Sequence, residues 1–242
     1  FYLLGQIMAS IISLIGAPGS GKGTYGTLLA SRILNASFIS VGDILRENSA
    51  TNENLASILR SGALVDDAIA NDAVIQSLES RAPLGTSNSR NDLVILDGYP
   101  RTYAQASLLS TWPASLRPSL AIQFDVPDHV CITKILGRRK CSICNKSFNI
   151  NGVNTDGFDM PAMLPEGECK LGCNREVDWK KRDDDTNDII KLRMEVYHKE
   201  TKPVLKYWEE RDQLLRFVPY NGVDDMDKLV PLVENHLTNV SD

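Results

Sequence analysis

Residues 16–24 read Gly16-Ala17-Pro18-Gly19-Ser20-Gly21-Lys22-Gly23-Thr24, and this stretch decides how the rest of the chain folds. The apolar run 11–15 before it has the composition of a buried strand, and the run 28–34 after it predicts a helix. A strand, a glycine-rich loop and a helix, in that order, form the setting that a phosphate-binding loop requires. Its glycines let backbone N–H groups turn toward an anion, and Lys22 adds a full positive charge. An ordinary glycine-rich turn is the alternative, which this composition and setting disfavour.

The residue after the lysine departs from the general form of such loops, which place Ser or Thr there as a magnesium ligand. Gly23 follows Lys22, and the first hydroxyl comes one residue later, at Thr24. We therefore expect a magnesium ion that is held mainly through water. The variant is typical of kinases that phosphorylate nucleoside monophosphates and not of translational GTPases or motor ATPases.

The bulk properties of the chain limit its partners. The sequence has 242 residues, a net charge of −5 and the apolar and charged fractions of an ordinary globular protein. No global basic field supports broad nucleic-acid binding, so a phosphate substrate needs a local cluster of arginines. No apolar run approaches the length of a membrane span. We expect neither a nucleic-acid partner nor association with a membrane.

The N-terminal run 1–15 is apolar, contains no lysine or arginine and leads directly into the glycine loop. We expect it to supply the first strand, because a secretory signal begins with basic residues and a mitochondrial presequence is rich in arginine. The chain opens on Phe1 and not on Met, so we expect either that a segment was removed upstream or that Met8 marks the natural start. The expected location is the cytoplasm, with the mitochondrion as the alternative.

Apolar runs alternate with helical segments along the whole chain. Runs of this kind, without polar alternation, predict a parallel sheet that is covered by helices on both faces. The fold class is therefore α/β with a five-stranded parallel sheet. The predicted strands are 11–15, 37–41, 92–97, 120–126 and 214–219. The predicted helices include one opened by Gly42-Asp43 and capped by Asp43, one over 128–140, and a long one after 186 that Pro203 interrupts.

A carboxylate stands where the ligand of a parallel sheet is expected. Asp97 ends the strand 92–97, and ligands bind outside the carboxyl ends of such strands. The turn that follows directs Arg101 toward the same crevice, and Gln105 lies one helical turn further on. Asp43 and Arg46 are neighbours on another helix, and a plain surface ion pair is the alternative interpretation for them.

With these motifs in view, the sequence resembles adenylate kinases of the long-lid type over nearly its whole length. The matching segments agree in order and spacing and are 16–24, 39–46, 96–101, 137–139, and Arg182-Asp183-Asp184-Asp185 with Arg193. The resemblance implies a monomeric P-loop kinase that reversibly makes two ADP from ATP and AMP. It further implies a core of residues 8–39, 68–136 and 179–242, an AMP-binding domain at 40–67 and a lid at 137–178.

The resemblance also assigns roles, because phosphoryl transfer needs positive charge around two nucleotides. Arg46 and Arg101 are expected at the AMP phosphate, and Asp97 with Asp43 at the magnesium waters. The predicted catalytic residues are Lys22, Asp97, Arg101, Arg138, Arg182 and Arg193. The predicted ATP-binding residues are Gly16, Ala17, Pro18, Gly19, Ser20, Gly21, Lys22, Gly23, Thr24, Lys134 and Arg138. The predicted AMP-binding residues are Val41, Asp43, Leu45, Arg46, Leu64, Val65, Gly98, Arg101, Gln105, Arg182 and Arg193.

The sequence identifies the residues that bind the nucleotide bases less clearly than those that bind the phosphates. Gln105 stands where adenylate kinases read the adenine edge, but Val41 replaces their usual threonine, and Lys134 replaces the arginine that packs on the ATP base. The alternatives are therefore a GTP:AMP phosphotransferase, a UMP/CMP kinase or, outside enzymes, a pseudo-kinase that recruits a partner through its lid. The intact set of lysine, arginines and aspartates argues against the last.

Four cysteines are clustered within the predicted lid. Cys141 and Cys144 form a CxxC pair, and Cys169 and Cys173 form a CxxxC pair. Four thiolates suit tetrahedral Zn²⁺, and this spacing favours zinc over two disulfides or free thiols. Some adenylate kinases carry a zinc-bearing lid here, which implies a structural role for the metal. The fifth cysteine, Cys131, lies in an apolar pattern and is expected in the core.

Overall fold

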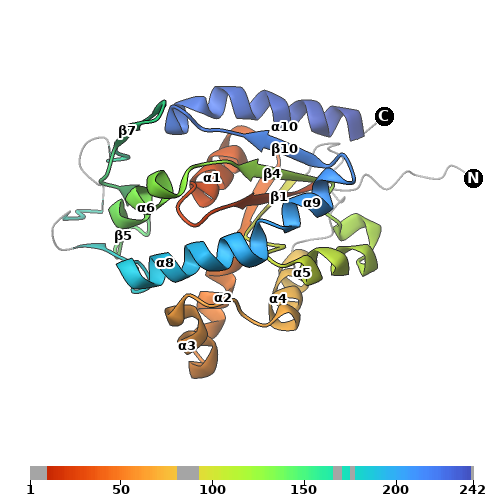
Figure 1. Ribbon diagram of the computed structural model, residues 1–242, viewed down its shortest axis with the longest axis horizontal. Coiled ribbons are helices and arrows are strands. Elements are labelled where there is room, and N and C mark those ends of the chain that lie inside the picture. Colours follow the sequence, from red (N-terminus) through yellow and green to blue (C-terminus); the bar gives the residue numbers. More distant parts are fainter. Residues whose placement is uncertain (1–9, 81–92, 166–170, 175–177, 241–242) are drawn as a thin grey trace, which may run out of the picture.

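A parallel sheet of five strands forms the centre of the protein in the computed structural model, which describes residues 10–80, 93–165, 171–174 and 178–240 (Figure 1). The strand order is β10-β4-β1-β3-β2. The strands are β1 (Ser10–Gly16), β2 (Ala36–Ser40), β3 (Leu93–Asp97), β4 (Leu120–Phe124) and β10 (Leu214–Phe217). The predicted fold class is confirmed, and each observed strand lies within two residues of its predicted bounds. Residues 1–9, including the alternative start at Met8, lie outside the described residues.

Both faces of the sheet are buried, because alternate residues of each central strand enter two different cores. Ile12 and Leu14 of β1 pack with α1 (Lys22–Arg32) and α10 (Met226–Val240). Ile11 and Ile15 pack on the other face. The helices of that second face are α4 (Asp67–Glu79), α5 (Tyr103–Leu108) and α9 (Val204–Glu209). This two-sided burial explains why the strands read as continuous apolar runs.

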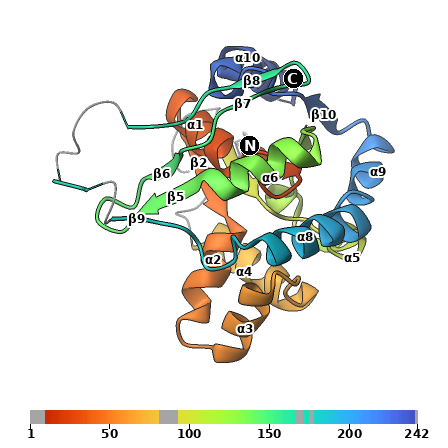
Figure 2. The same ribbon diagram turned by 60° about the vertical axis from the view of Figure 1, so that its left-hand side comes forward.

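Two short helices, α2 (Val41–Ser49) and α3 (Glu53–Ser61), extend from the sheet between β2 and α4 (Figure 2). Helix α2 begins earlier than predicted, because the Ser40 hydroxyl accepts a hydrogen bond from the Asp43 backbone N–H at 3.2 Å. Ser40 is therefore the N-cap, and the prediction that Asp43 caps this helix is wrong. The Asp43 side chain is thereby left available for the arginine three residues along.

The helix predicted over 128–140 ends early. Helix α6 (Asp128–Gly137) stops at Gly137, and Arg138–Cys141 forms strand β5, paired with β6 (Ser147–Asn149) and β9 (Trp179–Lys180). Strands this short carry too few residues to show a pattern of apolar alternation, so the sequence did not reveal them. Arg138 and Arg139 are therefore neighbours on a strand, and their side chains point to opposite faces.

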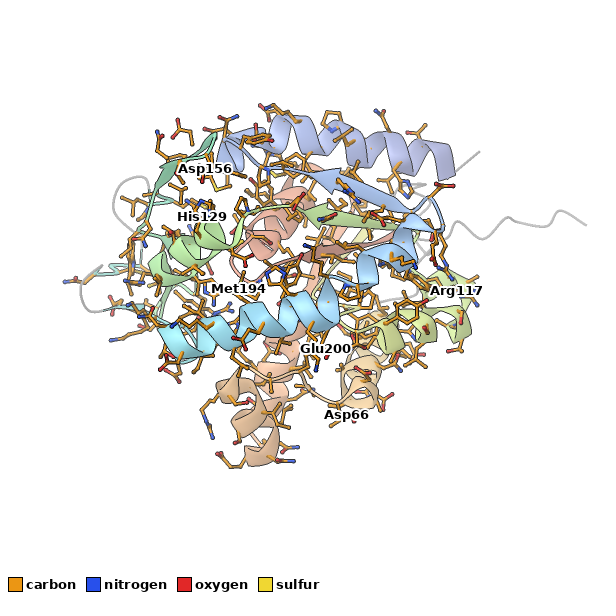
Figure 3. The ribbon with its side chains drawn as sticks, in the orientation of Figure 1. Asp66, Arg117, His129, Asp156, Met194 and Glu200 are labelled. Carbon is orange, nitrogen blue, oxygen red and sulfur yellow. The ribbon has the colours of Figure 1, made fainter. Side chains whose placement is uncertain are left out.

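A hairpin of β7 (Val153–Thr155) and β8 (Phe158–Met160) leaves the small sheet and packs on the core. The Phe158 and Tyr220 ring centroids are 5.1 Å apart, and the Asp159 N–H donates to the Tyr220 carbonyl at 2.7 Å. His129 Nε2 of α6 lies 3.0 Å from Asp156 Oδ2 at the hairpin turn (Figure 3). This part of the predicted lid segment therefore packs against the core in the arrangement described.

Pro203 interrupts the C-terminal helical region, as predicted. Helix α8 (Asn187–Val196) continues into a π-helical turn, η3 (Tyr197–Thr201), and α9 restarts directly after the proline. Short 3-10 turns are η1 (Leu109–Thr111), η2 (Ala114–Leu116) and η4 (Gly222–Asp225). Among the described residues, no helix has both the length and the apolar character needed to cross a membrane.

Candidate functional site

A cleft of about 660 Å³ opens at the carboxyl ends of the strands. Its volume lies within the range of small-molecule sites. The glycine loop, the start of α2, the turn after β3, strand β5 and helix α8 all contribute to its walls. Every residue predicted to bind nucleotide lines this cleft except Ala17, which is buried beneath the loop, and Ser20, which lines a small neighbouring cavity.

The glycine loop joins β1 to α1 and folds around its own lysine. Gly19 and Gly21 adopt left-handed backbone angles, with φ of 86° and 92°. A Cβ at Gly19 would lie 2.3 Å from the Cys131 carbonyl oxygen, so only glycine fits there. The Lys22 ammonium donates to the carbonyls of Gly16 at 2.7 Å and Ala17 at 2.8 Å. The cation is thus held at the mouth of a loop shaped for an anion.

Two partly buried groups of opposite charge, Lys22 and Asp97, interact electrostatically at the sheet end. Burial lowers the pKa of Lys22 to about 8, and the Asp97 carboxylate opposes that shift. Burial raises the pKa of Asp97, and Lys22 and Arg101 oppose that shift. Among the described residues Asp97 Oδ1 has no hydrogen-bond partner, and Oδ2 lies 3.5 Å from where a Cβ on Gly23 would stand. A carboxylate that lines the cleft beside the loop, with one oxygen lacking a protein partner, fits a magnesium ion held through water.

Asp43 lies between two arginines at the start of α2. The Arg46 guanidinium donates to Asp43 Oδ1 at 2.5 Å, and Arg182 lies 3.9 Å from the same oxygen. Burial alone would raise the pKa of Asp43, but the hydrogen bond and charge of Arg46 lower it. Asp43 and Arg46 are therefore not a simple surface pair, because both line the cleft and a third charged residue joins them.

Arginines from β5 and α8 meet two carboxylates, and we call Arg138, Asp184, Asp185 and Arg193 the acid–arginine cluster. Arg138 Nε donates to Asp185 Oδ2 at 2.9 Å, and a second bond joins the same two side chains. Arg193 donates to Asp184 at 2.7 Å and lies 3.6 Å from Asp185. The Asp185 side chain is 0% exposed. Sequence reasoning assigned no role to the two aspartates, although their place directly before α8 was visible in the matched motif.

The side chains of Arg138 and Arg139 point in opposite directions, as expected for consecutive residues of a strand. Arg138 reaches the cleft, whereas Arg139 donates to the backbone carbonyls of Leu136 and Arg138, at 3.0 and 2.7 Å. Arg138 therefore lines the cleft, and Arg139 is turned away from it by the alternation of side chains along β5.

The turn after β3 positions the remaining predicted residues. Gly98 has φ 83°, and Arg101 Nε donates back to its carbonyl at 3.0 Å. Gln105 is only 2% exposed, and its Oε1 accepts a hydrogen bond from the Arg101 backbone N–H at 2.7 Å. Val41, Leu45, Leu64 and Val65 supply apolar walls nearby. This end of the cleft combines an arginine, a buried amide and an apolar surface.

The opposite end of the cleft contains Lys134. Its ammonium donates to the backbone carbonyls of Asn151, Met160 and Pro161, at 3.1, 3.1 and 3.2 Å. Lys134 also borders a cavity of about 70 Å³ together with residues of the glycine loop and of η4. The Tyr25 hydroxyl donates to the Gly222 carbonyl in the wall of this cavity.

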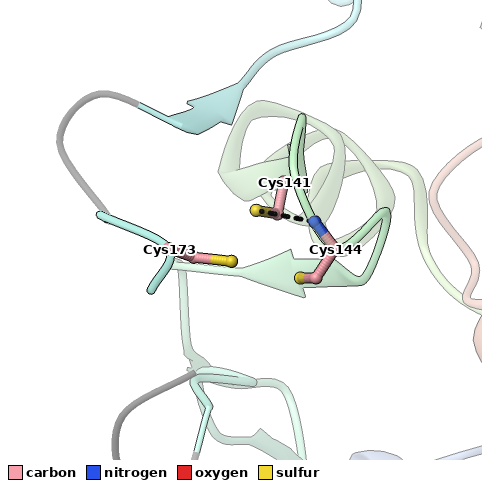
Figure 4. A group of neighbouring side chains, drawn as sticks. All are labelled: Cys141, Cys144 and Cys173. Carbon is pink, nitrogen blue, oxygen red and sulfur yellow. Dashed lines mark hydrogen bonds between the residues drawn. The ribbon is translucent and has the colours of Figure 1, made fainter. Parts of the chain in front are cut away.

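Three of the four clustered cysteines meet at the tip of the small sheet (Figure 4). The sulfur atoms of Cys141, Cys144 and Cys173 all lie within 4.8 Å of one another. The Cys144 backbone N–H donates to Cys141 Sγ at 3.5 Å. None of the described cysteines forms a disulfide, and Cys169 lies outside the described residues. Three convergent thiols with a fourth nearby in sequence fit tetrahedral zinc. Cys131 is buried in the core, as expected.

Comparisons with known proteins agree with this geometry. The sequence profile of the family described as "Adenylate kinase" matches residues 14–213. A protein of Plasmodium falciparum named "GTP:AMP phosphotransferase" is 33% identical, covering 94% of this chain and 97% of its own. "Adenylate kinase 1, chloroplastic" of Arabidopsis thaliana is 33% identical over 87% of this chain and 72% of its own. "Adenylate kinase" of Clostridium novyi is 33% identical over 93% and 96%.

Proposed function

The chain belongs to the adenylate kinase family, and from this premise we propose how its residues transfer the terminal phosphoryl group of ATP to AMP to give two ADP. It is a phosphotransferase. One observation carries the proposal: arginines from separate segments converge with Lys22 on a single cleft, in a protein of net charge −5. The cleft arginines are Arg46, Arg101, Arg138, Arg182 and Arg193.

We assign the two nucleotides to opposite sides of this cleft, with their phosphate groups facing each other at its centre. Lys22 and the backbone N–H groups of the glycine loop bind the β- and γ-phosphates of ATP. Arg46 and Arg101 bind the AMP phosphate, since both lie on the side of α2 and Gln105. Planar guanidinium groups bind phosphate by two parallel hydrogen bonds and so fix its orientation as well as its charge. An oxygen of the AMP phosphate is thereby positioned to attack the γ-phosphorus of ATP.

The transferring group lies between these sites, where Arg138, Arg182 and Arg193 are placed to receive it. Charge spreads over its equatorial oxygens in the transition state, so stabilising that charge is the main catalytic task. Asp184 and Asp185 hold two of these guanidinium groups toward the cleft before substrate arrives. Asp97, aided by Asp43, would hold magnesium through water. The ion, when bound, neutralises charge on the ATP phosphates.

Two segments close over the nucleotides in this proposal. Residues 40–67 act as the AMP-binding domain and 137–178 as the lid, on a core of 8–39, 68–136 and 179–242. Closure excludes water, which would otherwise hydrolyse the donor. We propose that Cys141, Cys144, Cys169 and Cys173 hold one structural Zn²⁺ in the lid. The monomeric state and the cytoplasmic location both stay predictions.

A coupled assay with purified protein tests the function directly. ATP and GTP are each combined with AMP, CMP and UMP, and ADP or GDP formation is measured. AMP is expected to exceed CMP and UMP in kcat/KM by about tenfold or more, because Gln105 is fixed within an apolar wall. Comparable rates with CMP would contradict the acceptor assignment. No turnover with any pair would favour a nucleotide-binding protein without kinase activity.

GTP is a second candidate phosphoryl donor, and the contacts of Lys134 are the observation that supports it. Its ammonium is occupied by three backbone carbonyls, and lysine does not stack on a base as arginine does. The similar Plasmodium protein is named for GTP. A higher kcat/KM for GTP than for ATP, with AMP retained as acceptor, would select this candidate.

A further inference from the structure

The amide of Gln105 is fixed from two sides by groups of opposite hydrogen-bonding character. Its Oε1 accepts from the Arg101 backbone N–H at 2.7 Å, and its Nε2 donates to Asp67 Oδ1 at 2.8 Å. A backbone N–H can only donate, and an ionised carboxylate can only accept. The oxygen and nitrogen of this amide therefore have one possible arrangement, although the two ends of a glutamine amide are otherwise nearly interchangeable.

Asp67 lies behind Gln105 and not in the cleft. Gln105 lines the cleft wall, whereas Asp67 is absent from that wall. The Thr102 hydroxyl lies 3.1 Å from both carboxylate oxygens of Asp67 and accepts the Gln105 backbone N–H at 3.0 Å. Asp67 also stands in the first turn of α4, where the helix dipole favours a negative charge. The carboxylate is thus itself held in place.

The fixed amide leaves one oxygen lone pair and one N–H for a ligand. A 6-aminopurine presents a donor at N6 beside the acceptor N1, which matches that pair. A 6-oxopurine presents an acceptor at position 6 beside the N1–H donor, which reverses the pattern and places like groups together. The two bases have the same size, so hydrogen bonding alone must separate them.

We propose that Asp67 is a specificity-determining positioning residue, which fixes the Gln105 amide so that the acceptor site takes a 6-aminopurine monophosphate and rejects a 6-oxopurine monophosphate. The proposal rests on the proposed function, in which Gln105 contacts the acceptor base. Asp67 acts through Gln105 and does not touch the substrate. Nothing in its own sequence surroundings marks it, because Asp66 beside it carries the same side chain.

The test compares AMP with IMP, which differ only at the edge in question. The AMP:IMP ratio of kcat/KM is measured for the wild type, Asp67→Asn, Asp67→Ala and Gln105→Ala. An asparagine can present either an oxygen or an N–H to Gln105, so it no longer imposes one orientation. We expect Asp67→Asn to lower the ratio by about tenfold, through a higher KM for AMP, with kcat and the KM for ATP within about twofold of wild type.

Asp66→Asn is the matched control, because it removes the same charge one residue away. Asp66 is exposed at the start of α4, and its side chain accepts from the Ala68 N–H at 2.8 Å and not from Gln105 (Figure 3). Its AMP:IMP ratio should equal that of the wild type.

Two outcomes would overturn the proposal in different ways. An unchanged ratio in both Asp67 variants, together with a collapsed ratio in Gln105→Ala, would leave Gln105 as the base reader and remove Asp67 from specificity. Asp67 would likewise have no role in specificity if its variants lost thermal stability but kept the wild-type AMP:IMP ratio. An unchanged ratio in Gln105→Ala as well would show that Gln105 does not contact the base. The acceptor assignment of the proposed function would then fail, and the role of Asp67 with it.

Discussion

Two groups of charged residues meet in the cleft and are held there by different means. The sheet-end group, Lys22, Asp97 and Arg101, lies at or within a few residues of strand ends. Backbone carbonyls bind the two cations of this group, Lys22 through Gly16 and Ala17 and Arg101 through Gly98. The acid–arginine cluster instead joins β5 to α8 and the turn before it, and its arginines are held by carboxylates.

Because the two groups are held by different partners, we expect them to contribute differently to catalysis and to the stability of the fold. Desolvation disfavours the charged forms of the sheet-end group, as the lowered pKa of Lys22 and the raised pKa of Asp97 show, so we expect its charges to serve the substrate and not the fold. The acid–arginine cluster is self-neutralising, so it both ties two segments together and presents guanidinium groups to phosphate. Substitutions in the first group should reduce activity alone, and those in the second should reduce activity and stability together.

The largest effect is expected from Lys22→Met. Removing the ammonium should lower kcat/KM by about a thousandfold, because it stabilises charge on the transferring phosphates. The melting temperature should not fall, since burial already disfavours this cation. Initial rates and thermal unfolding measure the two quantities. Lys199→Met, at a side chain that is 83% exposed, is the control and should match the wild type. A stability loss in Lys22→Met would remove the contrast between the two groups.

Asp185→Asn should affect both quantities. Its carboxylate is fully buried between Arg138 and Arg193, and removing its charge takes away the carboxylate partner of Arg138 and leaves Arg193 with Asp184 alone. We expect a loss of about 3 kcal/mol in the free energy of unfolding and about a hundredfold loss in kcat, because both arginines lose their positions. Asp183→Asn, at an exposed neighbouring position, should change neither. A variant as stable as the wild type would show that the cluster does not hold the segments together.

The same contrast explains how far the site could be predicted from the sequence. Lys22, Asp97 and Arg101 lie at or a few residues beyond strand ends, so the glycine loop, the turn after Asp97 and the predicted parallel sheet were enough to place them at the same edge. The partners of Arg138 could not be found in this way, because Asp185 is 47 residues away and is brought near only by the fold of the intervening segment. Asp67 was missed for a similar reason, since its contact with Gln105 spans 38 residues.

Local geometry was predicted less well where tertiary contacts decide it. Ser40 and Asp43 are both good N-cap residues, and only the end of β2 at Ser40 selects the first. Arg138 lies in a strand because β6 and β9 pair with it, although the preceding residues form a helix. In both cases the residue chemistry was evident from sequence, but the pairing partner that fixes the backbone was distant.

A smaller effect is expected from pH, and it tests the sheet-end group alone. Burial lowers the pKa of Lys22 from 10.5 to about 8, so its cation is present below that pH and is lost as the pH rises through it. The value of kcat/KM for ATP should therefore fall by about tenfold per pH unit above about 8, since this parameter reports the free enzyme. Lys22→Arg, which stays charged, should lack this fall at its own lower activity. An unchanged profile up to about pH 9.5 in the wild type would contradict the assignment.

The smallest effect on activity should come from removing zinc, and it asks what positions Arg138. Cys141 ends the same strand that begins with Arg138, so the proposed zinc would hold one end of β5 and Asp185 holds the other. We expect about one zinc per chain by metal analysis, and a melting temperature lower by several degrees after chelation or in Cys141→Ser, with kcat changed by less than about twofold. Chelator should not destabilise Cys141→Ser further. If zinc removal lowered kcat as much as Asp185→Asn does, the metal would also be needed to position the Arg138 guanidinium. The two ends of β5 would then determine that position together. A protein that contains no metal and is equally stable in chelator would contradict the zinc assignment. Asp185 alone would then hold this strand at the cleft.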